Sequence, residues 1–300
     1  MPNEYFDPGE QRASKVKALF ERIATRYDLL NDLQSFGLHR YWKRRVLELA
    51  QLRPGQRSLD LCCGTGDITL RLAQHGLEAV GLDFSEGMLR IAERRKAKFT
   101  AGNHDLRGNV PHLLVGPPRR GGQARAVSAK PPYLSEAIRG KEDKPSGSEL
   151  NKSSRAEILN YIRGDAQRVP FLEASFDVVT IGYGLRNLTS WEAGLREMCR
   201  VAKPGARLIV LDFGKPDNPI WRTIYFGYLR LFVPLLGLIF CGSASAYAYI
   251  LESLKHYPAQ RGVADRMRDL GLVNVRIINL LGGAMSINYG EKKWGIGVVE

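Results

Sequence analysis

The chain alternates short apolar runs with longer segments in which apolar residues recur every three or four positions. The short runs are typical of buried strands and lie at residues 59–61, 79–83, 158–163, 176–181 and 207–213. Helical spacing marks residues 15–50, 191–201 and 263–270, and a further helix is predicted after Ser85, its expected N-cap. Residues 273–279 and 284–288 make a terminal strand pair. We therefore expect an α/β fold: a doubly wound, mostly parallel seven-stranded sheet with an antiparallel edge strand.

A glycine-rich turn follows the first apolar run, and a helix begins directly after it. The turn reads CCGTGD over residues 62–67. Gly64 and Gly66 lack the Cβ atoms that would keep a ligand away from the backbone. The second run ends in Asp83, and an acid at the tip of the second strand of such a sheet binds ribose hydroxyls. Loop and acid together indicate a cofactor that contains a nucleoside.

The same turn argues against the common phosphate-binding loops. A pyrophosphate loop would carry a third glycine where Thr69 stands, and a triphosphate loop would carry Gly-Lys-Ser/Thr. The carboxylate of Asp67 at the mouth of the loop would repel phosphate, but it would suit an ammonium group. Adenosyl and amino-acid parts without phosphate describe S-adenosylmethionine, which we expect as the cofactor.

Composition indicates the kind of partner and the cellular compartment. The 300 residues, read as a single domain, carry a formal net charge of +13, which suggests an anionic partner surface, either nucleic acid or acidic lipid. The four cysteines stand at positions 62, 63, 199 and 241 without C-x-x-C spacing, so neither a metal site nor a disulfide framework is indicated. Reduced thiols and a polar amino terminus fit a cytoplasmic protein without a secretory signal. We expect Cys62 and Cys63 to be small residues under the loop.

Two segments depart from the regular pattern. Residues 231–241 are wholly apolar, but they are too short to span a membrane, and Pro234 and Gly237 weaken a helix. A buried core helix and an interfacial element touching lipid are both open there, because aromatic residues and Arg230 precede the run. Residues 100–157 are rich in Gly, Pro, Ser, Arg and Lys, and we expect a disordered insertion that emerges opposite the cofactor crevice. A nucleic-acid-binding arm is the alternative, although its arginines lack interleaved aromatic residues.

Eight stretches carry a further signal. They are FERIATRYDLLND (20–32), SFGLHRYWK (35–43), the Gly64 loop, GDAQRVPF (164–171), GLRN (184–187), KPG (203–205), LDF (211–213) and YILES (249–253). In this order they resemble the menaquinone/ubiquinone C-methyltransferase family of class I S-adenosylmethionine-dependent methyltransferases. The first two stretches and GLRN are specific to that family, whereas the glycine loop and KPG are shared by methyltransferases generally. The match covers about residues 16–292 apart from the insertion.

The resemblance implies methyl transfer to a ring carbon of a polyprenylated quinol. The expected substrate is demethylmenaquinol, and a 2-methoxy-6-polyprenyl-1,4-benzoquinol is the alternative. By the family's pattern, Thr65 and the backbone of Gly64–Gly66 hold the methionine part of the cofactor. Asp83 holds the ribose, and Asp165 and Ala166 frame the adenine. Gly182 is a further cofactor contact, where the family often has a serine and this chain offers only backbone.

Methyl transfer from a sulfonium needs in-line geometry and exclusion of water more than a strong base. Arg186, at the carboxyl end of the fourth strand, is placed to stabilise a phenolate-like oxygen or to orient a water. The alternative is a structural arginine that braces the crevice. Residues 15–50 are expected to form a helical lid, in which His39 begins a helix and packs on Trp42. Residues 218–258 would form a helical substrate-pocket segment.

Two other functions are open. One keeps the cofactor but methylates another small lipid, and the other is an RNA methyltransferase or nucleic-acid-binding protein. RNA methylation at a base nitrogen usually requires Asn/Asp-Pro-Pro-aromatic after the fourth strand, where GYGLR stands here. We therefore expect no nucleic-acid partner and a cytoplasmic enzyme in peripheral contact with the inner face of the cytoplasmic membrane. A homodimer is left open.

Overall fold

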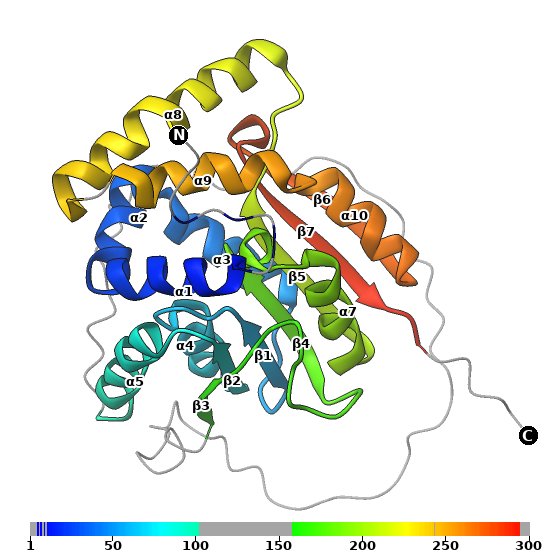
Figure 1. Cartoon of the computed structure of the whole chain (residues 1–300). Coiled ribbons are helices and arrows are strands. Elements are labelled where there is room, and N and C mark those ends of the chain that lie inside the picture. Colours follow the sequence, from blue (N-terminus) through cyan, green and yellow to red (C-terminus); the bar gives the residue numbers. More distant parts are fainter. Residues whose placement is uncertain are drawn as a thin grey trace, which may run out of the picture.

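Seven strands form one sheet in the order β3-β2-β1-β4-β5-β7-β6 (Figure 1). They are β1 (Arg57–Leu61), β2 (Glu78–Asp83), β3 (Leu159–Arg163), β4 (Phe176–Gly182), β5 (Ala202–Phe213), β6 (Leu272–Leu280) and β7 (Met285–Lys292). The computed structural model describes residues 5, 7, 9, 11–101, 158–242 and 244–294. All neighbouring strands are parallel except at β7, which lies antiparallel between β5 and β6 at one edge of the sheet. The predicted fold class is confirmed.

Helices cover both faces of this sheet. α3 (Leu38–Ala50), α4 (Asp67–Gln74) and α5 (Glu86–Thr100) lie on one face, and α7 (Trp191–Val201) and α10 (Ala259–Asp269) lie on the other (Figure 1). The Ser85 side chain accepts a hydrogen bond from the Met88 N–H, as expected of the N-cap of α5. Because β1 to β5 are all parallel, their carboxyl ends lie at the same edge of the sheet.

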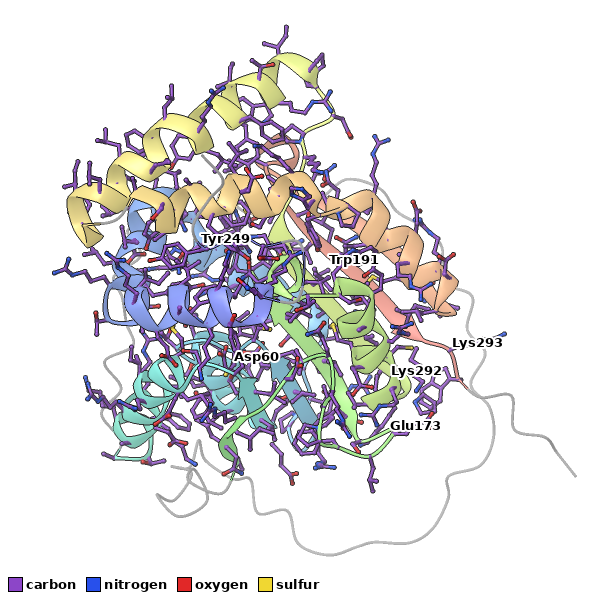
Figure 2. The ribbon with its side chains drawn as sticks, viewed as in Figure 1. Asp60, Glu173, Trp191, Tyr249, Lys292 and Lys293 are labelled. Atoms are coloured by element: carbon purple, nitrogen blue, oxygen red, sulfur yellow. The ribbon has the colours of Figure 1, made fainter. Side chains whose placement is uncertain are left out.

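The centre of the sheet is buried on both sides, yet it contains one acid. Leu59 and Leu61 of β1 are fully buried, and Asp60 between them is 1% exposed (Figure 2). Its two carboxylate oxygens accept hydrogen bonds from the hydroxyls of Thr69 at 2.7 Å and Thr180 at 2.8 Å. Burial raises the pKa of Asp60 to about 6, against the opposing effect of these hydrogen bonds. The acid therefore ties β1 to α4 and β4 directly below the glycine turn.

Further helices form a cap over the carboxyl edge of the sheet. The cap consists of α1 (Arg12–Ile23), η1 (Ala24–Arg26), α2 (Tyr27–Ser35), α8 (Pro219–Cys241) and α9 (Ala244–His256), joined to the sheet by η2 (Leu185–Asn187) and η3 (Leu281–Gly283). Figure 1 shows α8 as the outermost element, lying on α9, and α8 also contacts α2. The cap thus brings residues of the predicted lid and the predicted pocket segment together.

The apolar run at 231–241 is part of a much longer helix than its sequence predicted. α8 is continuous over 23 residues, and Pro234 lies inside it. Leu229 and Val233 are buried on its inner side, and such packing outweighs the roughly 3 kcal/mol that an internal proline costs. The span 219–240 is long and apolar enough to cross a membrane, with a mean hydropathy of 1.7, but this criterion rests on length and composition alone. Only 22% of the apolar 18-residue window within that span is buried, so a buried core helix is not what forms.

The predicted insertion begins and ends at the amino-terminal edge of the sheet. α5 runs back from the tip of β2 and ends at Thr100, and β3 begins at Leu159. Both points lie opposite the carboxyl edge, because β2 and β3 are parallel. Of the predicted insertion, residues 100–157, Thr100 is the last residue of α5 and Ala101 its C-cap, and residues 102–157 lie outside the described residues.

Candidate active site

The residues predicted to bind the cofactor lie in one row along the carboxyl edge of the sheet. Gly64–Gly66 follow β1, and Asp83 ends β2. Asp165 and Ala166 follow β3, and Gly182 ends β4. Because β3, β2, β1 and β4 are neighbours in that order, all of these positions are brought together. A crevice at this edge is where open α/β sheets bind their ligands.

The glycine turn depends on its backbone conformation. Gly64 and Gly66 have φ angles of +56° and +78°, which favour glycine. A Cβ on Gly66 would lie 2.3 Å from the Tyr161 hydroxyl, whereas a Cβ on Gly64 would meet nothing within 4 Å. Gly66 is therefore required by packing, and Gly64 leaves open space above the turn. Burial raises the pKa of both the Cys62 and Cys63 thiols well above the ordinary value, so neither is a thiolate nucleophile.

Asp83 joins the turn to the second strand directly. Its Oδ2 accepts a hydrogen bond from the Gly64 N–H at 2.8 Å, and its Oδ1 accepts one from the Ser85 N–H at 2.9 Å. Burial raises the pKa of Asp83 to about 6, although these backbone hydrogen bonds favour the ionised form. Each carboxylate oxygen has a second lone pair, so the side chain can still accept hydrogen bonds from a ligand.

The carboxylate of Asp67, which was expected to suit an ammonium group, is already paired with two basic side chains. Its Oδ2 lies 2.8 Å from Lys43 Nζ, and its Oδ1 accepts a hydrogen bond from Arg71 Nε at 3.0 Å. Although burial opposes ionisation, Lys43 and Arg71 hold the pKa of Asp67 well below its usual range. Sequence reasoning missed Lys43 as a site residue, and the available signal was its place at the end of the family-specific stretch 35–43.

The Thr65 side chain is held by two helices of the surrounding layers. Its hydroxyl donates to Asp28 Oδ1 at 3.0 Å and accepts a hydrogen bond from Arg95 Nη1 at 3.0 Å. Arg95 also donates to Asp28 Oδ2 at 2.5 Å. The turn is thereby tied to α2 and α5. Arg95 was also missed, because nothing distinguishes it from the other basic residues of α5.

Arg186 is buried and bound to the end of β5. Its Nη1 donates to Asp212 Oδ1 at 2.7 Å and to the Tyr183 carbonyl at 2.6 Å, and its backbone N–H donates to Asp212 Oδ2 at 3.1 Å. The guanidinium lies 4.5 Å from the centroid of the Phe213 ring. Burial disfavours the charged form, but the Asp212 carboxylate together with Tyr249 and Tyr27 outweighs it, and the pKa of Arg186 is raised. Arg186 is therefore a permanent positive charge in the wall of the site.

Two cavities lie between this row and the cap. The main cavity, about 230 Å³ in volume, lies under α8 and is lined mostly by apolar and aromatic residues of α2, α3, α8, β5 and η3. A small cavity next to it contains Arg186 and Tyr27 in its wall, together with Tyr249, which projects from α9 towards the interior in Figure 2. Tyr183 and Phe213 line both cavities. A ligand in the main cavity would therefore approach both Arg186 and the end of β4.

Within the described parts of the chain, no group of three or more His, Cys, Asp or Glu side chains is arranged to hold a metal ion. Of the predicted lid residues, Asn31 lines both cavities, His39 lines the main one and Tyr27 lines the small one. Asp28 is bound to the glycine turn, as described above.

This sheet order, with a glycine turn after β1 and an acid at the tip of β2, defines a class I S-adenosylmethionine-dependent methyltransferase. The fold is similar to that of a possible histamine N-methyltransferase from Thermotoga maritima, with a TM-score of 0.52 and 16% identity over 93% of this chain and 100% of that one. It is also similar to phosphoethanolamine N-methyltransferase 2 of Haemonchus contortus in complex with S-adenosylhomocysteine. There the TM-score is 0.51 at 12% identity, over 85% of this chain and 52% of that one. At these identities the likeness shows the fold alone.

The chain belongs to the ubiE/COQ5 methyltransferase family, whose family profile matches residues 8–109 and 144–292. It is 34% identical to the ubiquinone/menaquinone biosynthesis C-methyltransferase UbiE of Ectopseudomonas mendocina, over 95% of this chain and 91% of that protein. It is 33% identical to the demethylmenaquinone methyltransferase of Desulfitobacterium hafniense, over 95% of this chain and 92% of that protein. Identity to the mitochondrial 2-methoxy-6-polyprenyl-1,4-benzoquinol methylase of Danio rerio is also 33%, over 95% of this chain and 82% of that protein. The predicted family, enzyme class and methyl donor are confirmed.

Proposed function

We propose that this enzyme methylates a ring carbon of demethylmenaquinol to give menaquinol. The observation that carries the proposal is the main cavity, whose apolar walls suit a prenylated ring and which adjoins Arg186 through the shared residues Tyr183 and Phe213. The relative named demethylmenaquinone methyltransferase supports the same acceptor, and UbiE is named for both ubiquinone and menaquinone biosynthesis. A 2-methoxy-6-polyprenyl-1,4-benzoquinol is the second candidate, supported by the relative from Danio rerio.

The row of residues along the carboxyl edge fits the expected cofactor. Asp83 has free lone pairs for ribose hydroxyls, and Asp165 and Ala166 would frame the adenine. The open space above Gly64 admits the methionine part close to the backbone. Gly182 would contribute backbone only, because a Cβ there would lie 2.7 Å from Ile68 Cδ1. S-adenosylmethionine, when bound, supplies an electrophilic methyl group.

The Lys43–Asp67 pair gives the crevice charges of both signs. The amino-acid end of the cofactor is a zwitterion, so its ammonium and carboxylate groups are complementary to the pair. We infer that Asp67 shares its charge among Lys43, Arg71 and the cofactor ammonium. Thr65 would contact the cofactor through its backbone, and its hydroxyl would keep Asp28 in place through their hydrogen bond.

Arg186 is placed to stabilise negative charge on the quinol. Attack by a ring carbon is assisted when the ring hydroxyl loses its proton, fully or partly, because the phenolate-like oxygen then donates electron density to the ortho carbon. A guanidinium kept charged by Asp212 in a mostly apolar wall favours this charge distribution more than it would in water. The bracing hydrogen bonds to Tyr183 and Asp212 hold the group in place, so the two sequence interpretations of Arg186 are compatible.

α8 has the features of a helix that lies on a membrane surface. Three aromatic side chains fix its inner side to the protein: Trp221 Nε1 donates to the Leu281 carbonyl, Tyr225 to the Ala284 carbonyl and Tyr228 to the Gln34 carbonyl, at 2.7–2.9 Å. Its outer side exposes Ile220, Ile224, Leu231, Phe232, Leu235, Leu238 and Ile239. The helix contains two arginines and no acidic residue, so an anionic surface would attract it.

The same surface surrounds the main cavity. Phe36 is 76% exposed, and with Ile224 and Leu281 it both lines the cavity and reaches solvent. We therefore place the enzyme in the cytoplasm, in peripheral contact with the inner face of the membrane, so that a lipid-dissolved prenyl tail can remain in the bilayer while the ring enters. The homodimer stays a prediction.

The acceptor is tested with labelled S-adenosylmethionine and reduced demethylmenaquinone in vesicles. Oxidised demethylmenaquinone and a reduced prenylated benzoquinol serve as parallel acceptors. Label in the reduced naphthoquinol alone supports the menaquinone function, and label in both quinols makes the enzyme bifunctional. Tight cofactor binding with no label in either quinol would sink the proposed acceptor while leaving the family intact.

Membrane contact is tested by co-sedimentation with vesicles that contain 30% anionic lipid. Leu231→Glu should weaken partitioning by roughly tenfold, because a mostly exposed leucine that enters the interface contributes about 1.5 kcal/mol. Leu172→Glu is the matched control, since Leu172 is 83% exposed but precedes β4 at the opposite edge of the sheet. Equal losses from the two variants, or none from either, would refute docking through α8.

A further inference from the structure

The main cavity contains one imidazole among its mostly apolar walls. His39, near the start of α3, is 6% exposed and lines the cavity under α8. Its Nδ1 lies 3.0 Å from the Ser35 hydroxyl oxygen and 3.5 Å from Asp32 Oδ1. Within the described part of the chain, its Nε2 has no hydrogen-bond partner. This nitrogen is also not fully enclosed by the protein.

The hydrogen bonds around Ser35 fix the tautomer of this ring. The Ser35 hydroxyl donates its only proton to the Asn31 carbonyl oxygen. Its oxygen must therefore act as acceptor towards the His39 backbone N–H and towards Nδ1. Neutral His39 consequently carries its proton on Nδ1, where Asp32 also favours it. Nε2 is left with a lone pair.

The surroundings keep the His39 imidazole neutral. Burial and the nearby charge of Lys43 lower the pKa of His39 to about 4, and Arg40 acts in the same direction. Asp32 and Asp67 oppose this shift. Arg40 also holds Asp32, since its Nε and Nη2 donate to the two carboxylate oxygens at 3.0 and 2.7 Å. At neutral pH the cavity therefore contains an imidazole that can accept a proton.

We propose that Nε2 of His39 accepts the hydroxyl proton of the quinol during methyl transfer and returns it afterwards. The inference rests on the proposed quinol function and adds a catalytic residue to it. A ring hydroxyl that enters the cavity needs a hydrogen-bond acceptor, and the walls are mostly apolar. His39 offers a basic nitrogen with a lone pair that can meet this need.

The steps balance without a further reactant. The O–H bond breaks towards Nε2, and the electron pair moves through the ring to form the new C–CH₃ bond as the S–CH₃ bond breaks. The methylated ring carbon then loses its hydrogen as a proton to water, while Nε2 returns its own proton to the ring oxygen. One proton is released overall. A weak base suffices, because the hydroxyl becomes strongly acidic as the ring loses electron density.

His39→Asn is the sharpest variant. The asparagine amide N–H takes the place of Nδ1–H beside Ser35, and the variant lacks Nε2. We expect an unchanged dissociation constant for S-adenosylmethionine and a single-turnover methyl-transfer rate lower by roughly 10²–10⁴ at pH 7. His39→Gln, which places an amide oxygen near Nε2, should bind the quinol but remain slow, and it serves as a second variant if the first misfolds.

The pH profile separates a proton acceptor from a packing residue. The wild-type rate should be level from about pH 6 to 9, because His39 is already neutral there. In His39→Asn the reacting species becomes the ionised quinol, so the rate should rise about tenfold per pH unit towards the quinol pKa near 10. A variant rate that is lower by the same factor at every pH would overturn the inference. Failure of the wild type to methylate any quinol would instead overturn the proposed function.

The tautomer provides a test that does not depend on turnover. The chain has five histidines, so nitrogen NMR of the ¹⁵N-histidine-labelled enzyme identifies the His39 signals by their loss in His39→Asn. We expect the Nδ1–H form at pH 7 and protonation only near pH 4. An Nε2–H form, or a ring already protonated at pH 6, would contradict the assignment.

Discussion

The guanidinium of Arg186 and the carboxylate of Asp212 form a buried ion pair at 2.7 Å, joining the loop after β4 to the end of β5. The Arg186 backbone N–H donates to the other carboxylate oxygen, so the pair fixes both the side chain and the turn. Their side chains are 6% and 2% exposed. Removal of either partner would leave a charge in a place that water does not reach.

Asp212→Ala should therefore destabilise the fold strongly. We expect a loss of about 3–5 kcal/mol in the free energy of unfolding, because a buried charge left without its partner is costly. Asp212→Asn keeps a hydrogen-bond acceptor for Arg186, so its free energy of unfolding should fall by less. Urea unfolding followed by circular dichroism measures both variants, and an Asp212→Ala midpoint equal to that of the wild type would contradict the role of the pair.

Cofactor affinity should fall in acid because of Asp83. Burial raises the pKa of this carboxyl to about 6 in the free enzyme. The ionised form accepts hydrogen bonds from ribose, so the affinity is full above pH 6 and is lost as the pH falls through 6. Between pH 7 and pH 5 the dissociation constant should rise roughly tenfold.

Calorimetry with S-adenosylmethionine measures this pH dependence. Asp83→Asn should bind weakly at every pH, with a flat profile, and Asp83→Ala should bind more weakly still. Asp60 titrates in the same range, so a pH dependence that survives in Asp83→Asn would assign the effect to Asp60 instead.

The Lys43–Asp67 pair can be dissected with a double-mutant cycle. Asp67→Asn leaves the Lys43 side chain, which is 8% exposed, without its counter-ion. We expect a loss of about 1–3 kcal/mol in stability together with weaker cofactor binding. Adding Lys43→Met should restore stability but not affinity. Affinity that returns with stability would show that Asp67 acts only on the fold.

The strands and the row of cofactor residues could be predicted because both follow from local pattern. Apolar runs such as 176–181 are read directly as buried strands, and parallel strands place the residues after them at one edge. Gly64 and Asp83 could thus be assigned to one site before their hydrogen bond was known.

The ion pairs around the site could not be predicted in this way. Lys43 and Asp67 are 24 positions apart, and Arg95 and Asp28 are 67 apart. Charged residues on helices are usually solvated, so the pattern gives no sign of which ones meet. The length of α8 was missed for another reason, since tertiary packing outweighed the local effect of Pro234.

Tyr183 has an unusual backbone and an unsatisfied hydroxyl. Its φ angle is +61°, and among the described residues its buried hydroxyl has no hydrogen-bond partner. Removing such a hydroxyl should stabilise the free enzyme by about 1 kcal/mol, so Tyr183→Phe should unfold at higher urea. If the hydroxyl contacts the quinol, the same variant should raise KM for the quinol and leave the S-adenosylmethionine dissociation constant unchanged. Equal stability of the two proteins would show that the hydroxyl is hydrated.

The insertion should be dispensable for catalysis. The family profile leaves residues 110–143 unmatched, and the flanking elements α5 and β3 meet the insertion at the edge of the sheet opposite the cofactor row. A protein with residues 104–153 deleted should therefore keep its S-adenosylmethionine affinity and its methyl-transfer rate within about twofold, because loop closure between α5 and β3 affects stability only weakly. Vesicle binding by the deletion protein, compared with Leu231→Glu, would separate any contribution of the insertion's basic residues from that of α8. A deletion protein that folds and binds the cofactor but transfers no methyl group would show that the insertion takes part in the reaction.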